Sequence, residues 1–193
     1  MIRRIAVLLL LALPAAAEES IVAGMSQNRV SITADFDGSE ILIYGAVRRD
    51  TPAPADRGPL EVIVTVEGPS TPVTVRRKGR VAGIWVNTAS VLVDSAPSFY
   101  AVATTGPLNH ILSDTDNLRY GITIERVIRA VGITDEAEKA GEFLLGLLRV
   151  RTNEGRYRVL QGKVELTEET LFRTDVILPA NLTEGEYKVR LFL

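Results

Sequence analysis

The chain has 193 residues, 46% of them hydrophobic, and carries 22 Lys and Arg against 24 Asp and Glu, a formal net charge of -2. It contains no cysteine and one histidine, which excludes disulfides, thiolate metal sites, cysteine nucleophiles and histidine-rich metal centres. Its near-neutral charge argues against nucleic acid as the main partner, because nucleic-acid-binding proteins usually present a clearly basic face. Length and composition are those of an ordinary globular domain.

The first 17 residues are organised like a secretory signal peptide. Arg3 and Arg4 precede an unbroken apolar run at 5–13, and three alanines at 15–17 follow Pro14. The run is shorter than the roughly 20 apolar residues that span a bilayer, and the alanines suit a cleavage site. A buried N-terminal helix is the alternative. We therefore predict a signal peptide at 1–17 and an exported periplasmic domain at 18–193.

Short apolar segments with strand periodicity follow. Residues 60–66 place alternate apolar side chains on one face and Glu61 and Thr65 on the other, which predicts a strand with one buried face. The run 41–44 is apolar on both faces, as is typical of a central strand. A strand at 30–36 precedes it, joined by an Asp37-Gly38 hairpin turn.

More strands are predicted at 73–77 and 81–86, with a turn at Lys78-Gly79 between them. Two short apolar runs follow at 91–93 and 99–103. Turn residues thus recur roughly every 8–12 positions, the spacing of a β-sandwich or barrel.

The hydrophobic period then becomes helical, at about 118–152. Gly132 ends the first predicted helix and Thr134 is the predicted N-cap of the second. The apolar face of the first is Ile124, Val127, Ile128 and Val131, and that of the second is Ala137, Ala140, Leu144, Leu147 and Leu148. We therefore predict a helical pair inserted into a β-rich chain.

Strands return at 171–178 and 187–193. Between them, Leu182, Gly185 and Tyr187 have the spacing of a tyrosine corner, whose hydroxyl bonds to upstream backbone between strands E and F of an immunoglobulin-like sandwich. A strand that begins with a buried tyrosine is the alternative. The predicted fold is a mainly β, immunoglobulin-like β-sandwich with a helical insertion at 118–152. A last strand beyond Leu193 is expected, because strand F would otherwise be an exposed apolar edge.

Candidate catalytic residues are few. His110 with Asp114 or Asp116 could act as a general base, and Ser113 as a nucleophile. However, the chain has no G-x-S-x-G elbow, and sequence neighbours rarely form a triad. A polar connection before the helices is the favoured interpretation of this segment.

Metal sites receive no better support. The acidic segment 35–40 lacks EF-hand spacing, and the loop 113–117 would bind a hard cation only weakly. Asn181-Leu182-Thr183 matches a glycosylation sequon by chance in a bacterial chain. We predict no catalytic, cofactor-binding or metal-binding residues.

The densest basic cluster is Arg76, Arg77, Lys78 and Arg80. It could contact anionic lipid headgroups or an acidic partner, or it could protect the edge of a hairpin. Strand alternation would place Arg76 and Arg77 on opposite faces, which weakens the case for a single patch. Trp85, the only tryptophan, is expected to pack in the core or against a sheet.

Three stretches of the chain are distinctive when taken together: Arg76-Arg77-Lys78, Val81-Ala82-Gly83-Ile84-Trp85-Val86-Asn87 and Ala96-Pro97-Ser98-Phe99-Tyr100-Ala101-Val102-Ala103. They resemble a family of alphaproteobacterial transmembrane proteins of unknown function. The resemblance covers nearly all of 18–193 and implies a longer chain with a C-terminal membrane anchor. The longest late apolar run, 143–148, is too short to be that anchor and is interrupted by Gly146, so we expect it beyond Leu193. The resemblance brings no catalytic residues.

Three functional hypotheses remain. The first is a non-catalytic interaction module, tethered at the periplasmic face of the inner membrane, whose partner is another envelope or inner-membrane protein. The second is a small-ligand-binding domain in which the helices cover the sheet near Trp85 and Phe99. The third, and least favoured, is a hydrolase that uses His110.

Overall fold

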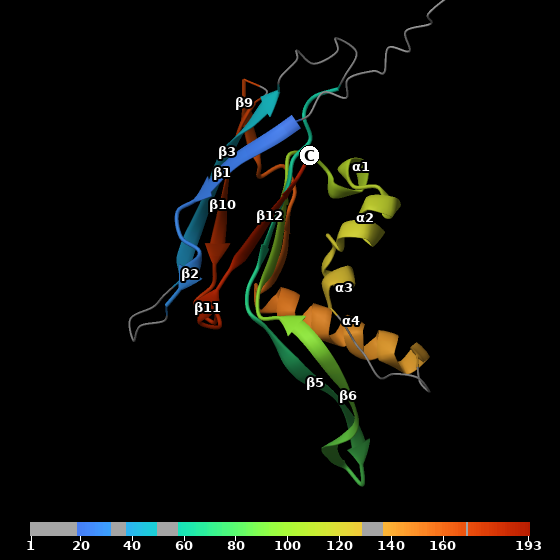
Figure 1. The fold of residues 1–193 in the computed structure, drawn as a ribbon. Coiled ribbons are helices and arrows are strands. Elements are labelled where there is room, and N and C mark those ends of the chain that lie inside the picture. The colour runs from blue at the N-terminus through green and yellow to red at the C-terminus, as the bar shows by residue number, and fades with distance from the viewer. Residues whose placement is uncertain (1–18, 32–37, 50–57, 129–136, 169) are drawn as a thin grey trace, which may run out of the picture.

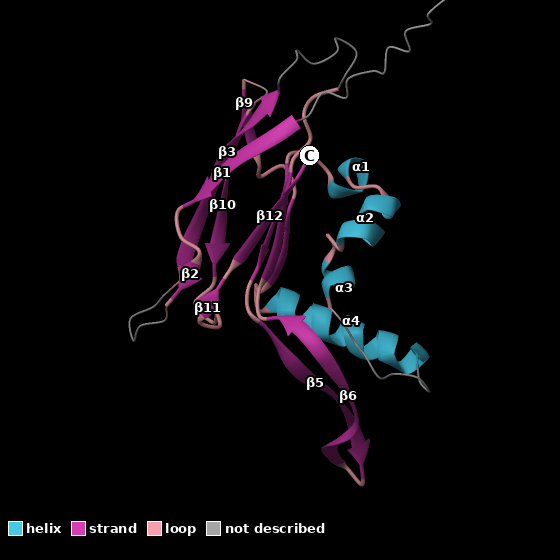
Figure 2. Cartoon of the chain, in the orientation of Figure 1, coloured by secondary structure: helices cyan, strands magenta, loops and turns pink. Residues whose placement is uncertain are grey.

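The computed structural model describes residues 19–31, 38–49, 58–128, 137–168 and 170–193. The predicted signal peptide, most of the predicted strand at 30–36, Asp37 of the predicted turn and the predicted cap Thr134 lie outside the described residues. The fold is mainly β, with open sheets and a group of helices on one side (Figure 2).

Two four-stranded sheets form the body. The first consists, in spatial order, of β1 (Glu19–Met25), β3 (Ser39–Arg49), β10 (Leu171–Leu178) and β9 (Glu165–Thr167). The second consists of β12 (Lys188–Phe192), β4 (Ile63–Glu67), β7 (Tyr100–Thr104) and β8 (Tyr157–Leu160). Their strand pairs are antiparallel except for β7 with β8. A short ladder also joins β2 (Arg29–Val30) to β11 (Gly185–Glu186).

The two sheets share one hydrophobic core. Alternate residues of β3 and β10 point inward, among them Ile43 and Val176, and meet the inward residues of β4 and β7, among them Val64 and Ala101. The prediction that 41–44 is a central strand is confirmed, since β3 lies between β1 and β10. Its outer face is nevertheless partly in solvent, because Tyr44 there is 51% exposed.

The second sheet is buried on both faces. A second core lies behind it, where Ile63, Tyr100 and Val102 meet residues from the helices and from β6. The prediction that residues 60–66 bury one face only is therefore wrong, since Thr65 is also fully buried. Period-two alternation shows which face is apolar, but the other face is buried because the helices cover it.

Within the described residues, four helices cover the second sheet, where the sequence predicted two. They are α1 (Leu108–Ile111), α2 (Asp114–Tyr120), α3 (Ile124–Val127) and α4 (Ala137–Asn153). The helical region therefore begins about ten residues earlier than the predicted 118. Such short helices are marginal in isolation, so they depend on tertiary packing that periodicity does not report.

The longest hairpin projects from the body and is called the arm, residues 70–97. It consists of β5 (Ser70–Val81) and β6 (Ile84–Pro97), and Figure 1 shows that it extends past α4. The predicted turn at Lys78-Gly79 is wrong, because Lys78 pairs with Asn87 and the ladder continues to Val81. The turn is Ala82-Gly83, where both φ angles are positive (49° and 86°) as in a type I′ turn.

The hydrogen bond predicted for a tyrosine corner is present. Tyr187 Oη donates to the carbonyl oxygen of Thr183 at 3.0 Å. The ring is buried, and its centroid lies 6.1 Å from that of Phe99 in the core between the sheets. This bond holds the segment that leads into β12 against the core.

Candidate functional site

The arm concentrates positive charge. Arg76, Arg77, Lys78 and Arg80 lie in it with one acidic residue, Asp94, although the whole chain has a net charge of -2. Because the arm then contributes +3, the rest of the chain contributes -5. Charge is therefore segregated between the arm and the body.

A β-bulge lies opposite these cations, and the cations themselves follow regular alternation along β5. Arg77 pairs with Ala89 and Lys78 with Asn87, so Thr88 is the extra residue on β6. Strand alternation places Arg76, Lys78 and Arg80 on one face and Arg77 on the other. The predicted separation of Arg76 from Arg77 is confirmed, and three cations nevertheless form a row on one face.

The end of the arm is apolar and exposed. Val81 is 53% exposed, Ile84 64% and Trp85 68%. Trp85 pairs with Arg80, so the indole lies at the end of the row of cations. The expectation that Trp85 packs in the core or against a sheet is therefore wrong. We call residues 81–86 the tip.

The root of the arm is held by the body. Val93 and Ala96 of β6 are buried in the second core. Farther out, Arg77 Nη1 lies 3.1 Å from Glu142 Oε2 of α4, and its guanidinium lies 5.7 Å from the centroid of the Phe143 ring. The ion pair is exposed, so it contributes little stability, and it links the arm to α4.

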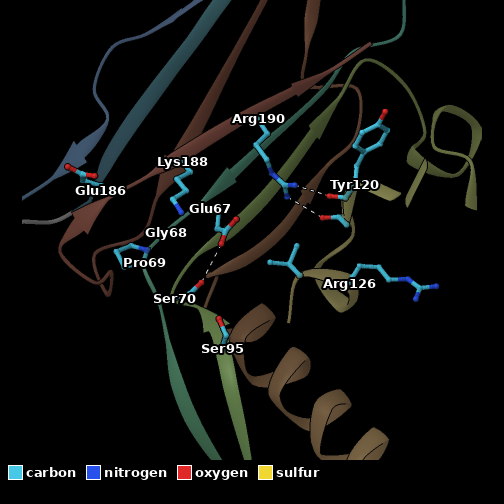
Figure 3. A pocket seen from close by; sticks show the side chains of 12 residues that line it. Glu67, Gly68, Pro69, Ser70, Ser95, Tyr120, Arg126, Glu186, Lys188 and Arg190 are labelled. Carbon is cyan, nitrogen blue, oxygen red and sulfur yellow. Dashed lines mark hydrogen bonds between the residues drawn. The ribbon is translucent and has the colours of Figure 1, made fainter. Parts of the chain in front are cut away.

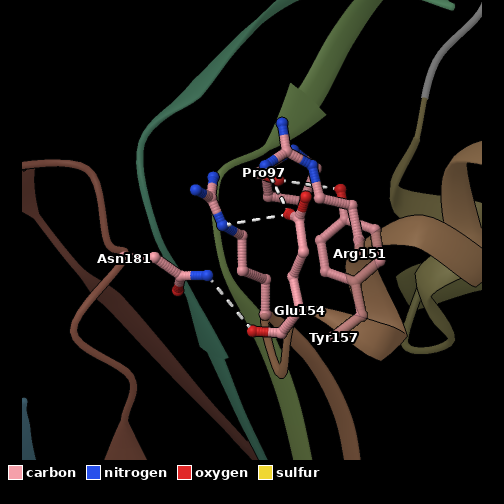
Figure 4. Close-up of polar contacts among 6 residues, drawn as sticks. Pro97, Arg151, Glu154, Tyr157 and Asn181 are labelled. Carbon is pink, nitrogen blue, oxygen red and sulfur yellow. Dashed lines mark hydrogen bonds and ion pairs between the residues drawn. The ribbon is translucent and has the colours of Figure 1, made fainter.

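A buried hydrogen bond ties the end of β6 to the start of β8, and more exposed polar contacts lie beside it at the end of α4 (Figure 4). Tyr157 Oη donates to the carbonyl of Pro97 at 2.8 Å, and burial raises the pKa of Tyr157 to about 12. Glu154 lies 3.4 Å from Arg151 Nη1, and Asn181 donates to the Glu154 carbonyl at 3.3 Å. The arm therefore projects from a rigid junction.

A cavity of about 520 Å³ lies between β12, the root of the arm and the α2–α3 segment (Figure 3). Arg190 donates from Nη1 to the Tyr120 carbonyl at 2.9 Å, and from Nη2 to the Gly121 carbonyl and to Tyr100 Oη, both at 3.2 Å. Gly121 ends α2, so the cation also faces the negative end of that helix. Arg190 therefore holds the helices against β12.

The charge around this cavity is mixed. Lys188 and Arg126 line it together with Glu67 and Glu186. The Arg190 guanidinium is already engaged with backbone carbonyls, and burial raises the pKa of the adjacent Tyr100. The cavity thus lacks a cluster of one sign, and its clearest role is structural.

The candidate catalytic residues occupy a helix cap. Ser113 Oγ accepts a hydrogen bond from the Asp116 amide at 3.1 Å and donates to Asp116 Oδ2 at 2.6 Å, which makes Ser113 the N-cap of α2. His110 is exposed on α1, and Asp114 is exposed in the first turn of α2. Among the described residues, no hydrogen bond joins His110 to Ser113 or to either carboxylate.

Metal ligands are not grouped in the described part of the chain. Within those ranges, no three His, Asp or Glu side chains lie close enough to hold an ion. Asp35 and Asp37 of the acidic segment lie outside the described residues.

The hypothesis that the helices cover a ligand site near both Trp85 and Phe99 is also wrong, because these two residues lie in different parts of the molecule. Phe99 is fully buried between the sheets, whereas Trp85 lies at the tip of the arm. The alternation of residues 81–86 beside four basic residues could have indicated the arm. Its length depends on pairing between residues up to 27 positions apart, such as Ser70 with Pro97, which no local pattern reports.

The profile of one protein family, described as "Putative transmembrane protein (Alph_Pro_TM)", matches residues 20–193. The chain belongs to this family, as the resemblance predicted. No curated protein and no solved structure matches it. Among the described helices, none combines the length and the hydrophobicity needed to cross a bilayer.

Proposed function

We propose that the protein is a non-catalytic envelope protein that acts at the periplasmic face of the inner membrane by contact with another envelope component. The arm is the observation that carries this proposal. It places three large apolar side chains in solvent at the end of a two-stranded ribbon, an element that is marginally stable in water without further support. Such a projection has the features of a contact surface.

The proposal includes an immunoglobulin-like type for the two-sheet body. Two facing sheets with one core and the bond from Tyr187 to Thr183 support this type. In that arrangement the body is a scaffold, and the arm and the helices are additions to the face of the second sheet.

Site-specific photo-crosslinking in living cells tests the contact role. A photoreactive residue replaces Ile84 at the tip or, as a matched control, Ile177 on β10, since both isoleucines are similarly exposed (64% and 58%). We expect crosslinked products in the envelope fraction from position 84 and none from position 177. The absence of crosslinked products at both positions would contradict the proposal.

A ligand-binding function is the second candidate, because a cavity of about 430 Å³ lies between the helices and the second sheet. Its lining is mostly apolar and includes Tyr100, Val102, Leu108, Ile124, Leu148 and Tyr157. Native mass spectrometry tests it. A bound small molecule in the wild type that is lost in Val102→Phe, whose larger side chain fills space there, would support ligand binding over contact.

A further inference from the structure

We propose that the tip of the arm docks on a bilayer that carries anionic phospholipids. This inference rests on the proposed contact role of the arm and names its partner. The argument has three parts: the depth of the apolar tip, the position of the cations behind it, and the charge of the remaining chain.

The tip is suited to shallow insertion. Its exposed apolar side chains, Val81, Ile84 and Trp85, surround the Ala82-Gly83 turn, so no charged group precedes them into the membrane. Val86, the last residue of the tip, pairs with Gly79, two residues from Val81 along β5. Because each strand residue advances about 3.3 Å, the tip is roughly 7 Å deep, with Arg80 and Trp85 paired halfway along it. Apolar faces of interfacial elements enter the headgroup region to a depth of roughly 5–10 Å, which the tip matches.

The cations lie where headgroups would be. Arg80 is adjacent to Val81 and pairs with Trp85, and Lys78 and Arg76 follow at two-residue steps on the same face. Long basic side chains can extend their charged ends toward phosphate while their stems remain on apolar surface. An indole ring prefers the same interfacial depth, because it combines an apolar body with one N–H donor.

The negative charge of the body favours approach of the arm, rather than the body, to an anionic membrane. The remaining chain contributes -5 to the net charge, so an anionic surface repels it while it attracts the arm. Three apolar side chains also form a surface far smaller than the roughly 1,000 Å² that a stable protein–protein interface requires. Membrane docking needs no shaped partner surface, since its apolar and electrostatic contributions add.

Trp85 provides the measurement, because it is the only tryptophan in the chain. The protein is used in the form that the cell produces, and its Trp85 fluorescence is recorded with two kinds of vesicle. One contains phosphatidylcholine alone, and the other contains phosphatidylcholine with 30% phosphatidylglycerol. We expect a blue shift and quenching by brominated acyl chains with the anionic vesicles, both reversed by 0.5 M NaCl. Vesicles of phosphatidylcholine alone should bind much more weakly.

Matched variants separate the row of cations from general charge. Each Lys or Arg near an anionic bilayer contributes about fivefold to affinity, so loss of the row should weaken binding on the order of 100-fold. The control removes the same charge from exposed positions on the body and should change affinity much less. The two sets of substitutions are R76Q/K78Q/R80Q for the row and R119Q/K163Q/R173Q for the control.

A third variant tests insertion of the tip. Val81→Ser combined with Ile84→Ser keeps Trp85 and the cations, and it should lose the quenching by brominated chains. Because all these side chains are exposed, circular dichroism spectra should match the wild type.

Two results would overturn the inference. One is a Trp85 spectrum that anionic vesicles do not change, and the other is equal weakening by the row and control substitutions. If anionic vesicles do not change the Trp85 spectrum but position 84 crosslinks to a protein or to a second copy of the chain, the lipid inference is wrong and the contact role stands. If position 84 forms no crosslink to either protein or lipid in cells, and anionic vesicles leave the Trp85 spectrum unchanged, the contact role itself is wrong.

Discussion

Replacement of Tyr157 by Phe tests the junction from which the arm projects. Tyr157 is 3% exposed, and its hydroxyl donates to the carbonyl of Pro97 at 2.8 Å. Phenylalanine fills the same volume, so the variant loses the hydrogen bond and leaves that carbonyl without this partner. The expected loss in the free energy of unfolding at pH 7.5 is about 1–2 kcal/mol.

The same group makes stability dependent on pH. Burial raises the pKa of Tyr157 from 10.0 to about 12, so the folded state favours the neutral phenol. The resulting stabilisation is fully present below pH 10 and is lost as the pH rises through 12. It amounts to roughly 3 kcal/mol in total, at a little over 1 kcal/mol per pKa unit, and about half of it is gone at pH 11.

Urea unfolding at pH 7.5 and pH 11 measures both effects. The wild type should be the more stable protein at pH 7.5, and its advantage over Tyr157→Phe should shrink by roughly 1 kcal/mol at pH 11. Tyr44→Phe on the exposed outer face of β3 is the control, and it should differ from the wild type by less than about 0.5 kcal/mol at both pH values. An advantage that stays constant between the two pH values would refute the reasoning.

Four further substitutions test packing and anchoring. Gly45→Ala should destabilise the fold by about 1–3 kcal/mol, because its Cβ would lie 2.6 Å from the ring of Phe172 and as close to the backbone of β1. By contrast, Gly146→Ala, in open space within α4, should stabilise it by about 0.5–1 kcal/mol; thermal melts compare the two, and equal signs would contradict the argument. Tyr187→Phe should cost about 1 kcal/mol in urea unfolding through loss of its backbone bond, and an unchanged midpoint would show that the corner contributes nothing. Arg190→Gln should speed amide exchange in α2 and α3 while leaving the first sheet unchanged, and uniform exchange across both would contradict its role as a local anchor.

Local patterns predicted much of the fold. Strand β10 alternates buried and exposed residues along its whole length, as its period-two pattern predicted. The long helix α4 lies where apolar residues recur at helical spacing. The spacing before Tyr187 predicted its hydrogen bond to upstream backbone. Each of these depends on neighbours within a few residues, and such neighbours are visible in a sequence.

The errors have one physical origin. Thr65 is buried because helices from a distant segment cover its face, whereas Tyr44 on the outer side of β3 is 51% exposed. The hairpin turn was placed four residues early because Lys78-Gly79 is a good turn pair, but cross-strand pairing continues through it. Coverage and pairing are long-range properties that override local preference.

The candidate site shows the same division. The sequence indicated the basic cluster and the alternatives of lipid or acidic partner for it, and it separated Arg76 from Arg77 correctly. It misplaced Trp85, because a lone tryptophan in an apolar strand is usually buried. The basic and apolar residues of 76–86 are visible in the sequence. The sequence does not show that this segment projects away from the body.

The sequence alone determined the family, the mainly β composition, the helical character near the middle of the chain, and the scarcity of residues suited to catalysis. Tertiary structure decided that one sheet is covered on both faces and that the β5–β6 ribbon leaves the body with Trp85 at its end. The physical reason is that hydrophobic periodicity shows which side chains of a segment are apolar, whereas their burial depends on which distant segments pack against them and exclude water.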